Sequence, residues 1–297
     1  MSDQAETLRS LMHEHRSAIE QVPAAVGQAH RPRRVVAVAS GKGGVGKSNF
    51  CINFGLALQQ VGTQPVVLDA DMGFADVELL LGVQPRNTIF DVLSGKDVFD
   101  VIEVSSGGLH FLSSGNGLNV APLTPEDVGR LSAHMDRLFE RYDVVLIDAG
   151  AGDGGQLGYL LAEVDDLLLV TTPEPTAIAD AYALVKMLSV RGQLPPVKIV
   201  VNKVPNFGEG RQAADKLKLA AQRFLGVELS VLGYVVEDAA VARAVMRQQA
   251  LVQAFPTSPA ARCMRQIVQN YTRSAQPPSR QGGTRVWERW LQRLRRR

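Results

Sequence analysis

The chain has 297 residues, of which 45% are hydrophobic and 21% charged, and its 32 basic and 30 acidic residues leave a net charge of only +2. This composition is typical of a folded globular protein and argues against a disordered chain or one whose overall charge serves nucleic-acid binding. The two cysteines, Cys51 and Cys263, form no CxxC pair, which argues against a disulfide framework or a zinc knuckle. With no signal-peptide pattern and no apolar run long enough for a bilayer, we expect a cytoplasmic protein.

The first part of the chain is predicted to lie outside the main domain. Residues 1–20 have apolar side chains roughly on one face of a helix, and residues 21–32 read as a linker because they contain proline, glycine and small residues. We therefore expect a short N-terminal helix joined by a linker to the rest of the chain.

A regular pattern of short apolar runs begins near residue 33 and continues to about residue 272. Most runs are continuous rather than alternating, which is typical of strands buried on both faces of a parallel sheet. Segments of helical character separate them, among others at 124–141, 175–191, 211–225 and 239–250. Strand–helix alternation predicts an α/β domain with a doubly wound, mostly parallel sheet flanked by helices. The runs are 35–39, 65–68, 109–112, 143–147, 167–170, 197–201 and 231–235.

A phosphate-binding loop follows the first predicted strand. Residues Gly41 to Ser48 fit G-x-x-x-x-G-K-[ST], and a predicted helix starts at about Lys47. Glycines let successive N–H groups point at phosphate oxygens, and the following helix directs its positive end to the same place. Lys47 would neutralise phosphate charge and Ser48 would offer its hydroxyl to Mg²⁺. The pattern therefore predicts a P-loop ATPase that uses ATP and Mg²⁺.

Carboxylates follow two of the predicted strands, at the edge where open α/β sheets bind ligands. Asp69 and Asp71 follow the strand at 65–68, although an N-cap role for Asp71 stays open. Asp148 follows four buried apolar residues, which is the arrangement of a Walker B aspartate that reaches Mg²⁺. The glycine-rich stretch around Gly152 suits a switch segment that senses the terminal phosphate.

The second lysine of the loop, Lys42, makes the sequence resemble the deviant Walker A motif of MinD/ParA ATPases. The resemblance covers about residues 33 to 272 and implies an ATP-dependent sandwich dimer in which Lys42 contacts the partner subunit's phosphates. It further implies that Asp69 orders the Mg²⁺ shell, that Asp71 orients the attacking water, and that Asn202 reads adenine; an Asx turn is the alternative for Asn202. The predicted catalytic residues are Lys42, Lys47 and Asp71, and the metal ligands are Ser48, Asp69 and Asp148. The predicted nucleotide contacts are Gly43, Gly44, Val45, Gly46, Lys47, Ser48, Asn49, Asp148, Gly152 and Asn202.

Two further segments resemble the flagellar branch of that family, called FlhG, FleN or YlxH. Residues 69–78 with Leu81-Gly82, and residues 254–261, look like this subfamily, which sets flagellar number and position in bacteria. The N-terminal D-Q-A-x-x-L-R pattern is similar to the activator motif for the GTPase FlhF, in which a glutamine is chemically suited to orient water. The implied partner-binding residues are Asp3, Gln4, Ala5, Leu8 and Arg9; a polar tail without this role is the alternative.

The last residues predict a membrane-surface helix. Residues 273–284 have linker composition, and residues 285–297 would place one apolar stripe beside five of the six arginines in this segment. A helix of this length covers only about 20 Å, too short to cross a bilayer, so we expect it to lie on the inner face of the cytoplasmic membrane. A helix that packs back on the core is the alternative. The stripe residues are Val286, Trp287, Trp290, Leu291 and Leu294.

The function that these patterns favour is a slow, ATP-switched regulator of flagellar placement, dimeric with ATP, that stimulates an FlhF-type GTPase. One alternative is an interaction protein that inhibits a flagellar transcription activator or contacts a C-ring component. Another is a DNA-partitioning ParA, although we expect no specific nucleic acid.

Overall fold

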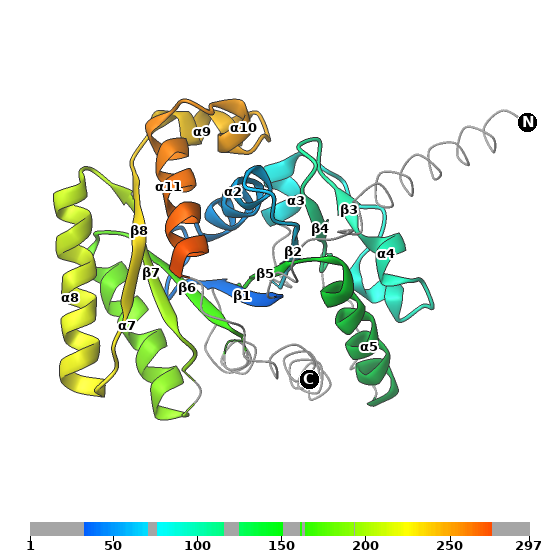
Figure 1. The fold of residues 1–297 in the computed structure, drawn as a ribbon, viewed down its shortest axis with the longest axis horizontal. Helices are drawn as coiled ribbons and strands as arrows, with labels where there is room; N and C mark the ends of the chain where they lie inside the picture. Colours follow the sequence, from blue (N-terminus) through cyan, green and yellow to red (C-terminus); the bar gives the residue numbers. More distant parts are fainter. Residues whose placement is uncertain are drawn as a thin grey trace, which may run out of the picture.

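One mixed sheet of eight strands organises the computed structural model, which describes residues 33–70, 76–115, 125–150, 161, 164–192 and 194–274. Its strand order is β3-β4-β2-β5-β1-β6-β7-β8, and every pairing is parallel except that of β3 with β4. The predicted doubly wound α/β fold is thereby confirmed (Figure 1). The strands are β1 (Arg34–Ala39), β2 (Pro65–Asp69), β3 (Glu103–Val104), β4 (His110–Leu112), β5 (Val144–Asp148), β6 (Asp166–Thr171), β7 (Val197–Val204) and β8 (Ser230–Val236).

The central strands separate two hydrophobic cores. All residues of β1, β2, β5 and β6 are buried, because their continuous apolar runs supply side chains to both faces. Along β1, Val35 and Ala37 belong to one core, and Val36 and Val38 to the other, as the two-residue period of a strand requires.

Helices cover both faces of the sheet. Side chains of α5, α7 and α8 fill one core, and side chains of α2, α9, α10 and α11 fill the other. The helices are α2 (Lys47–Gln60), α3 (Asp76–Leu81), α4 (Val98–Val101), α5 (Pro125–Arg141), α7 (Pro175–Val190), α8 (Phe207–Leu225), α9 (Ala239–Met246), α10 (Leu251–Ala254) and α11 (Pro259–Ser274), with a 3-10 turn at Ile89–Val92.

One predicted helix is shorter than expected. The pattern at 239–250 suggested continuous helix, whereas α9 ends at Met246 and α10 starts at Leu251. Gln248 between them has a φ of 51°, a left-handed conformation that interrupts a right-handed helix. The final helix, α11, was not predicted; it continues to Ser274 and so includes the first residues that the sequence assigned to a linker.

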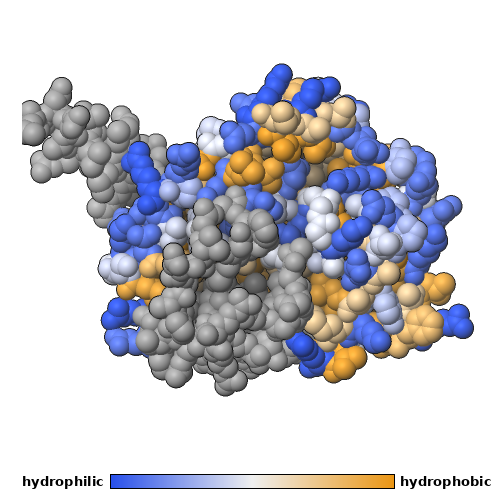
Figure 2. All heavy atoms as spheres, turned by 180° about the vertical axis from the view of Figure 1, so that it is seen from behind, coloured by the Kyte–Doolittle hydropathy of each residue, from blue (hydrophilic) through white to orange (hydrophobic). Residues whose placement is uncertain are grey.

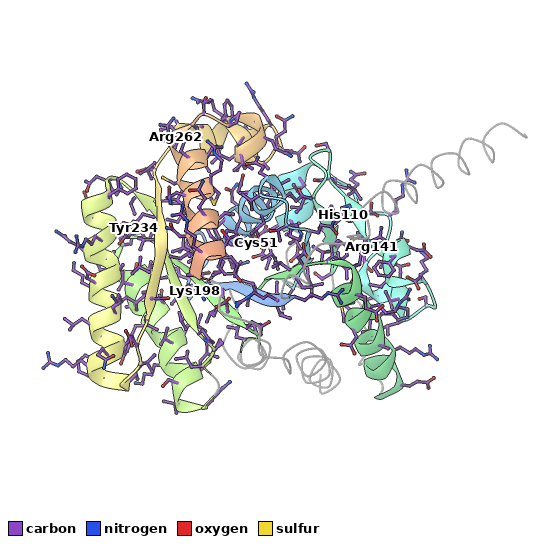
Figure 3. The ribbon with its side chains drawn as sticks, viewed as in Figure 1. Cys51, His110, Arg141, Lys198, Tyr234 and Arg262 are labelled. Carbon is purple, nitrogen blue, oxygen red and sulfur yellow. The ribbon has the colours of Figure 1, made fainter. Side chains whose placement is uncertain are left out.

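A buried ion cluster joins the start of β1 to the end of α11. The Asp166 carboxylate pairs with Arg34 and Lys198 and accepts a hydrogen bond from the Tyr271 hydroxyl at 3.0 Å. Lys198 lies beside the lower end of α11 (Figure 3). Burial raises the pKa of Tyr271 well above its ordinary value, so this hydroxyl stays a donor. Both ends of the described core therefore lie at the amino ends of the parallel strands. The phosphate loop lies at the opposite edge of the sheet, where β1 ends.

Candidate nucleotide-binding site

Glycine gives the loop between β1 and α2 its shape. Gly44 and Gly46 have φ values of 78° and 86°, in the left-handed region that other residues rarely adopt. A Cβ on Gly41 would lie 2.2 Å from the Asp180 carbonyl carbon and oxygen in the α7 backbone. Glycine is therefore the only residue type at position 41 that lets the loop pass this close to α7. The predicted strand–loop–helix is confirmed, with α2 beginning at Lys47.

Lys47, Ser48 and Asp148 meet at the end of the loop. The Lys47 ammonium donates to Asp148 Oδ1 at 2.6 Å and to Ser48 Oγ at 3.1 Å. Both side chains of the ion pair are almost entirely buried, with exposed fractions of 7% and 0%. A buried ammonium held between a hydroxyl and a carboxylate gives the site the donors and the charge that a phosphate–metal complex requires.

Asp69 brings a second carboxylate to the same edge of the sheet. Asp69 and Asp148 are register partners at the carboxyl ends of β2 and β5, and both are buried. Mg²⁺ is usually held by one or two carboxylates together with hydroxyl, phosphate and water oxygens. The residues present therefore fit a magnesium ion: Ser48, Asp69 and Asp148 would hold it, with nucleotide phosphates completing its shell. Within the described ranges no group of three or more His, Cys, Asp or Glu is placed to bind a metal alone.

Lys42 contacts different residues from those that Lys47 contacts. Its ammonium is 3.1 Å from Glu174 Oε2 and 3.2 Å from Thr176 Oγ1, both at the start of α7. The two charged side chains are 39% and 64% exposed, so the pair is screened by solvent and weak. Lys42 was predicted from the sequence and Glu174 was not, because no pattern in the chain links residues this far apart.

Asn202 and Lys203, at the end of β7, both touch the phosphate loop. Asn202 Nδ2 donates to the Val45 carbonyl and Lys203 Nζ to the Gly44 carbonyl, each at 2.8 Å. The predicted contact residue Asn202 thus lies at the loop, while Lys203 was not predicted. Asn49 is half-buried in the first turn of α2, where its oxygens accept from Asn53 Nδ2.

Cys51, one turn after Lys47 on α2, is a structural residue. Its side chain is completely buried and lies in the interior beside α2 (Figure 3). Burial, followed by the nearby Asp148 carboxylate, raises its pKa well above the ordinary value of a thiol. The thiol therefore stays protonated and packs as a small apolar group.

Several predicted residues lie outside the part of the chain that the structure describes. This holds for the water-orienting candidate Asp71, for Gly152, and for both terminal segments. Their roles stay predictions. The terminal residues concerned are Asp3, Gln4, Ala5, Leu8, Arg9, Val286, Trp287, Trp290, Leu291 and Leu294.

The surface carries scattered apolar side chains in a mainly hydrophilic setting (Figure 2). Val190 on α7 and Leu219 and Phe224 on α8 are 76%, 66% and 68% exposed. Across the described residues, none of the helices has both the length and the apolar character needed to cross a membrane.

Comparison with known families decides which P-loop protein this geometry belongs to. Residues 31–272 match the family model described as ParA, NUBPL iron-transfer P-loop NTPase. The chain belongs to the ParA family of P-loop NTPases. Its members are ATPases, and this one falls in the FlhG/FleN/YlxH branch predicted from the sequence. It is 36% identical to the antiactivator FleN of Pseudomonas aeruginosa, over 82% of this chain and 88% of FleN. It is 30% identical to the flagellum site-determining protein YlxH of Helicobacter pylori, over 75% of this chain and 76% of YlxH.

Solved structures of ParA-family proteins share the fold. MinD in the MinC:MinD complex of Aquifex aeolicus superimposes with a TM-score of 0.65 at 24% identity, covering 83% of this chain and 98% of that chain. MinD of Pyrococcus horikoshii, solved with Mg-ADP, superimposes with a TM-score of 0.63 at 23% identity over 80% and 95% of the two chains.

Proposed function

We propose that this ParA-family ATPase controls flagellar number and placement by cycling between an ADP-bound or nucleotide-free monomer and an ATP-bound dimer at the cytoplasmic membrane. The observation that carries the proposal is the buried meeting of Lys47 with Ser48 and Asp148, in a chain whose relatives include a flagellum site-determining protein.

In the proposed binding step, the loop from Gly43 to Ser48 donates backbone N–H groups to the phosphates of ATP. The Lys47 side chain turns from Asp148 toward the phosphate oxygens, and Asp148 and Asp69 would then help to hold Mg²⁺. When bound, Mg²⁺ supplies charge stabilisation for the phosphates. The Asn202 amide reads the base.

In the proposed hydrolysis step, Asp71 orients the attacking water and Lys42 contacts the phosphates bound by the second subunit. Because one residue from each subunit would complete the other's site, hydrolysis depends on dimer formation and is slow in the monomer.

The terminal segments carry the output in this proposal. Residues 1–20, with the motif residues Gln4 and Arg9, stimulate an FlhF-type GTPase, and residues 285–297 bind the membrane surface through Trp287 and Trp290. A dimer presents two such tails, and the second binds at a raised effective concentration. Dimerisation alone thereby converts ATP into a membrane signal.

A second candidate is an ATP-gated inhibitor of a flagellar transcription activator. It is favoured by the name of one relative, antiactivator FleN, and by exposed apolar side chains such as Leu219 and Phe224 that suit protein contacts. A DNA-partitioning ATPase is distinguished by a DNA shift assay against liposome flotation. An iron-transfer role, suggested by the family model's name, finds no CxxC pair in this chain.

The deciding experiment measures mass by light scattering with ATP or ADP, beside the ATP hydrolysis rate. Asp71→Ala is expected to form a dimer with ATP without turning it over, whereas Lys47→Ala binds no ATP and stays monomeric. The exposed Lys216 on α8 gives a matched control, Lys216→Ala, that behaves as wild type. A wild-type protein that neither binds ATP nor dimerises would refute the proposal.

A further inference from the structure

Two consecutive residues at the end of β7 reach the same loop, which a regular strand does not allow. Successive side chains of a strand point to opposite faces, yet Asn202 and Lys203 donate to the neighbouring carbonyls of Val45 and Gly44. Lys203 has a φ of 54°, and the β7–β8 pairing is irregular between Val201 and Val204. This local distortion turns both side chains toward the phosphate loop.

The distortion has a free-energy cost, because a lysine with positive φ is disfavoured relative to glycine. The conformation is held by contacts made across the sheet from residues far away in the chain. Besides the two hydrogen bonds, a Cβ on Gly46 would lie only 2.6 Å from Asn202 Nδ2, so the loop backbone packs directly against the amide. The loop from Gly44 to Gly46 is therefore shaped by the end of β7 as well as by its own glycines.

We infer that Lys203 is a positioning residue for triphosphate binding, which together with Asn202 braces the phosphate loop from the end of β7. Lys203 fixes the Gly44 carbonyl, so that the adjoining N–H groups point at the phosphates. This deepens the proposed ATPase function and rests on it.

The test separates the brace from direct contact with the base. Affinities of the full chain for Mg-ATP and for Mg-tripolyphosphate, which has no base, are compared by calorimetry and competition for wild type, Lys203→Met, Lys203→Arg and Lys203→Gly. Removal of the Lys203 ammonium is expected to lower the affinities for both ligands by the same factor, about tenfold for the loss of one charged hydrogen bond. Lys203→Arg should recover most of the affinity, and Lys203→Gly, which tolerates the positive φ, should behave like Lys203→Met.

Each other outcome overturns part of the inference. A lower affinity for ATP with an unchanged affinity for tripolyphosphate would mean that Lys203 contacts the base. Wild-type affinity for both ligands in Lys203→Gly would mean that only the backbone conformation at this position matters. Thermal unfolding without ligand, with Lys216→Met as the control, reports whether the variants fold. Failure of wild type to bind either ligand would instead refute the proposed function itself.

Discussion

The Lys42 ammonium lies 3.1 Å from the Glu174 carboxylate of its own chain. Glu174 is the residue immediately before α7, and Thr176 in the first turn of the same helix also accepts from Lys42. A lysine that acts on a second subunit must first leave these partners. In the proposed dimer, the need to break this solvent-exposed ion pair would therefore oppose association.

Glu174→Gln is predicted to favour the ATP-bound dimer. The proposed dimer breaks two such pairs, one in each subunit. Since an exposed pair contributes about 0–1 kcal/mol, the dimer dissociation constant should fall by at most about thirtyfold. Sedimentation equilibrium with ATP in the Asp71→Ala background measures it. An unchanged constant would show that the Glu174 contact does not oppose dimerisation.

Loss of the Lys47 ammonium is predicted to destabilise the ligand-free fold through Asp148. Removing one partner of a buried pair costs about 3–5 kcal/mol, and the Asp148 side chain has no exposed surface. Lys47→Met should lower the free energy of unfolding by that amount, and adding Asp148→Asn should restore more than half of it. Urea unfolding of both single variants and the double variant tests this, and additive effects would contradict it.

Gly41 and Gly43 are predicted to respond differently to alanine. A Cβ at Gly41 would collide with the Asp180 backbone, whereas nothing lies within 4 Å of one at Gly43. Gly41→Ala should lower the Tm of the ligand-free protein by about 5 °C, since overpacking costs about 1–3 kcal/mol. Gly43→Ala should leave the Tm unchanged. Equal Tm values for the two variants would mean that the loop does not need its close approach to α7.

Stability is predicted to fall in alkali because of two buried tyrosines. Burial raises the pKa of Tyr142 and of Tyr271 well above their ordinary value. Above pH of about 10 the unfolded chain releases these protons while the folded chain keeps them, so the free energy of unfolding decreases as pH rises. Below that pH the two groups contribute no pH dependence.

The Tyr142→Phe/Tyr271→Phe variant should flatten this decline. Urea unfolding at a series of alkaline pH values measures the slope for each protein. The same slope in wild type and variant would exclude the two tyrosines as its cause.

The order of strands along the chain and the phosphate loop were predictable because they depend on local patterns. Continuous apolar runs identified the strands from β1 to β8 other than β3, and the spacing of Gly46, Lys47 and Ser48 identified the loop. Asp69 and Asp148 were recognised from their positions after buried runs, and the structure makes them register partners.

The contacts made by residues far apart in the chain were not predictable. Glu174 and Lys203 carry no motif, and their partners Lys42 and Gly44 lie more than a hundred residues away. The end of α9 also escaped prediction, because the left-handed Gln248 is not a residue type that marks a break. Local sequence describes the elements well, whereas side-chain pairs across the sheet depend on how those elements are assembled.

The Asp166 cluster makes the ATPase core a candidate for circular permutation. Arg34 at the start of β1 and Tyr271 near the end of α11 share one carboxylate, so the two ends of the described core are neighbours, as Figure 1 illustrates. β1 is six residues long, so the phosphate loop lies about 20 Å away at its other end. A short linker could join Ser274 to Arg33, and new chain ends could be opened in an exposed turn. The segments that precede residue 33 and follow residue 274 would then be attached at that turn, while the nucleotide site stays intact.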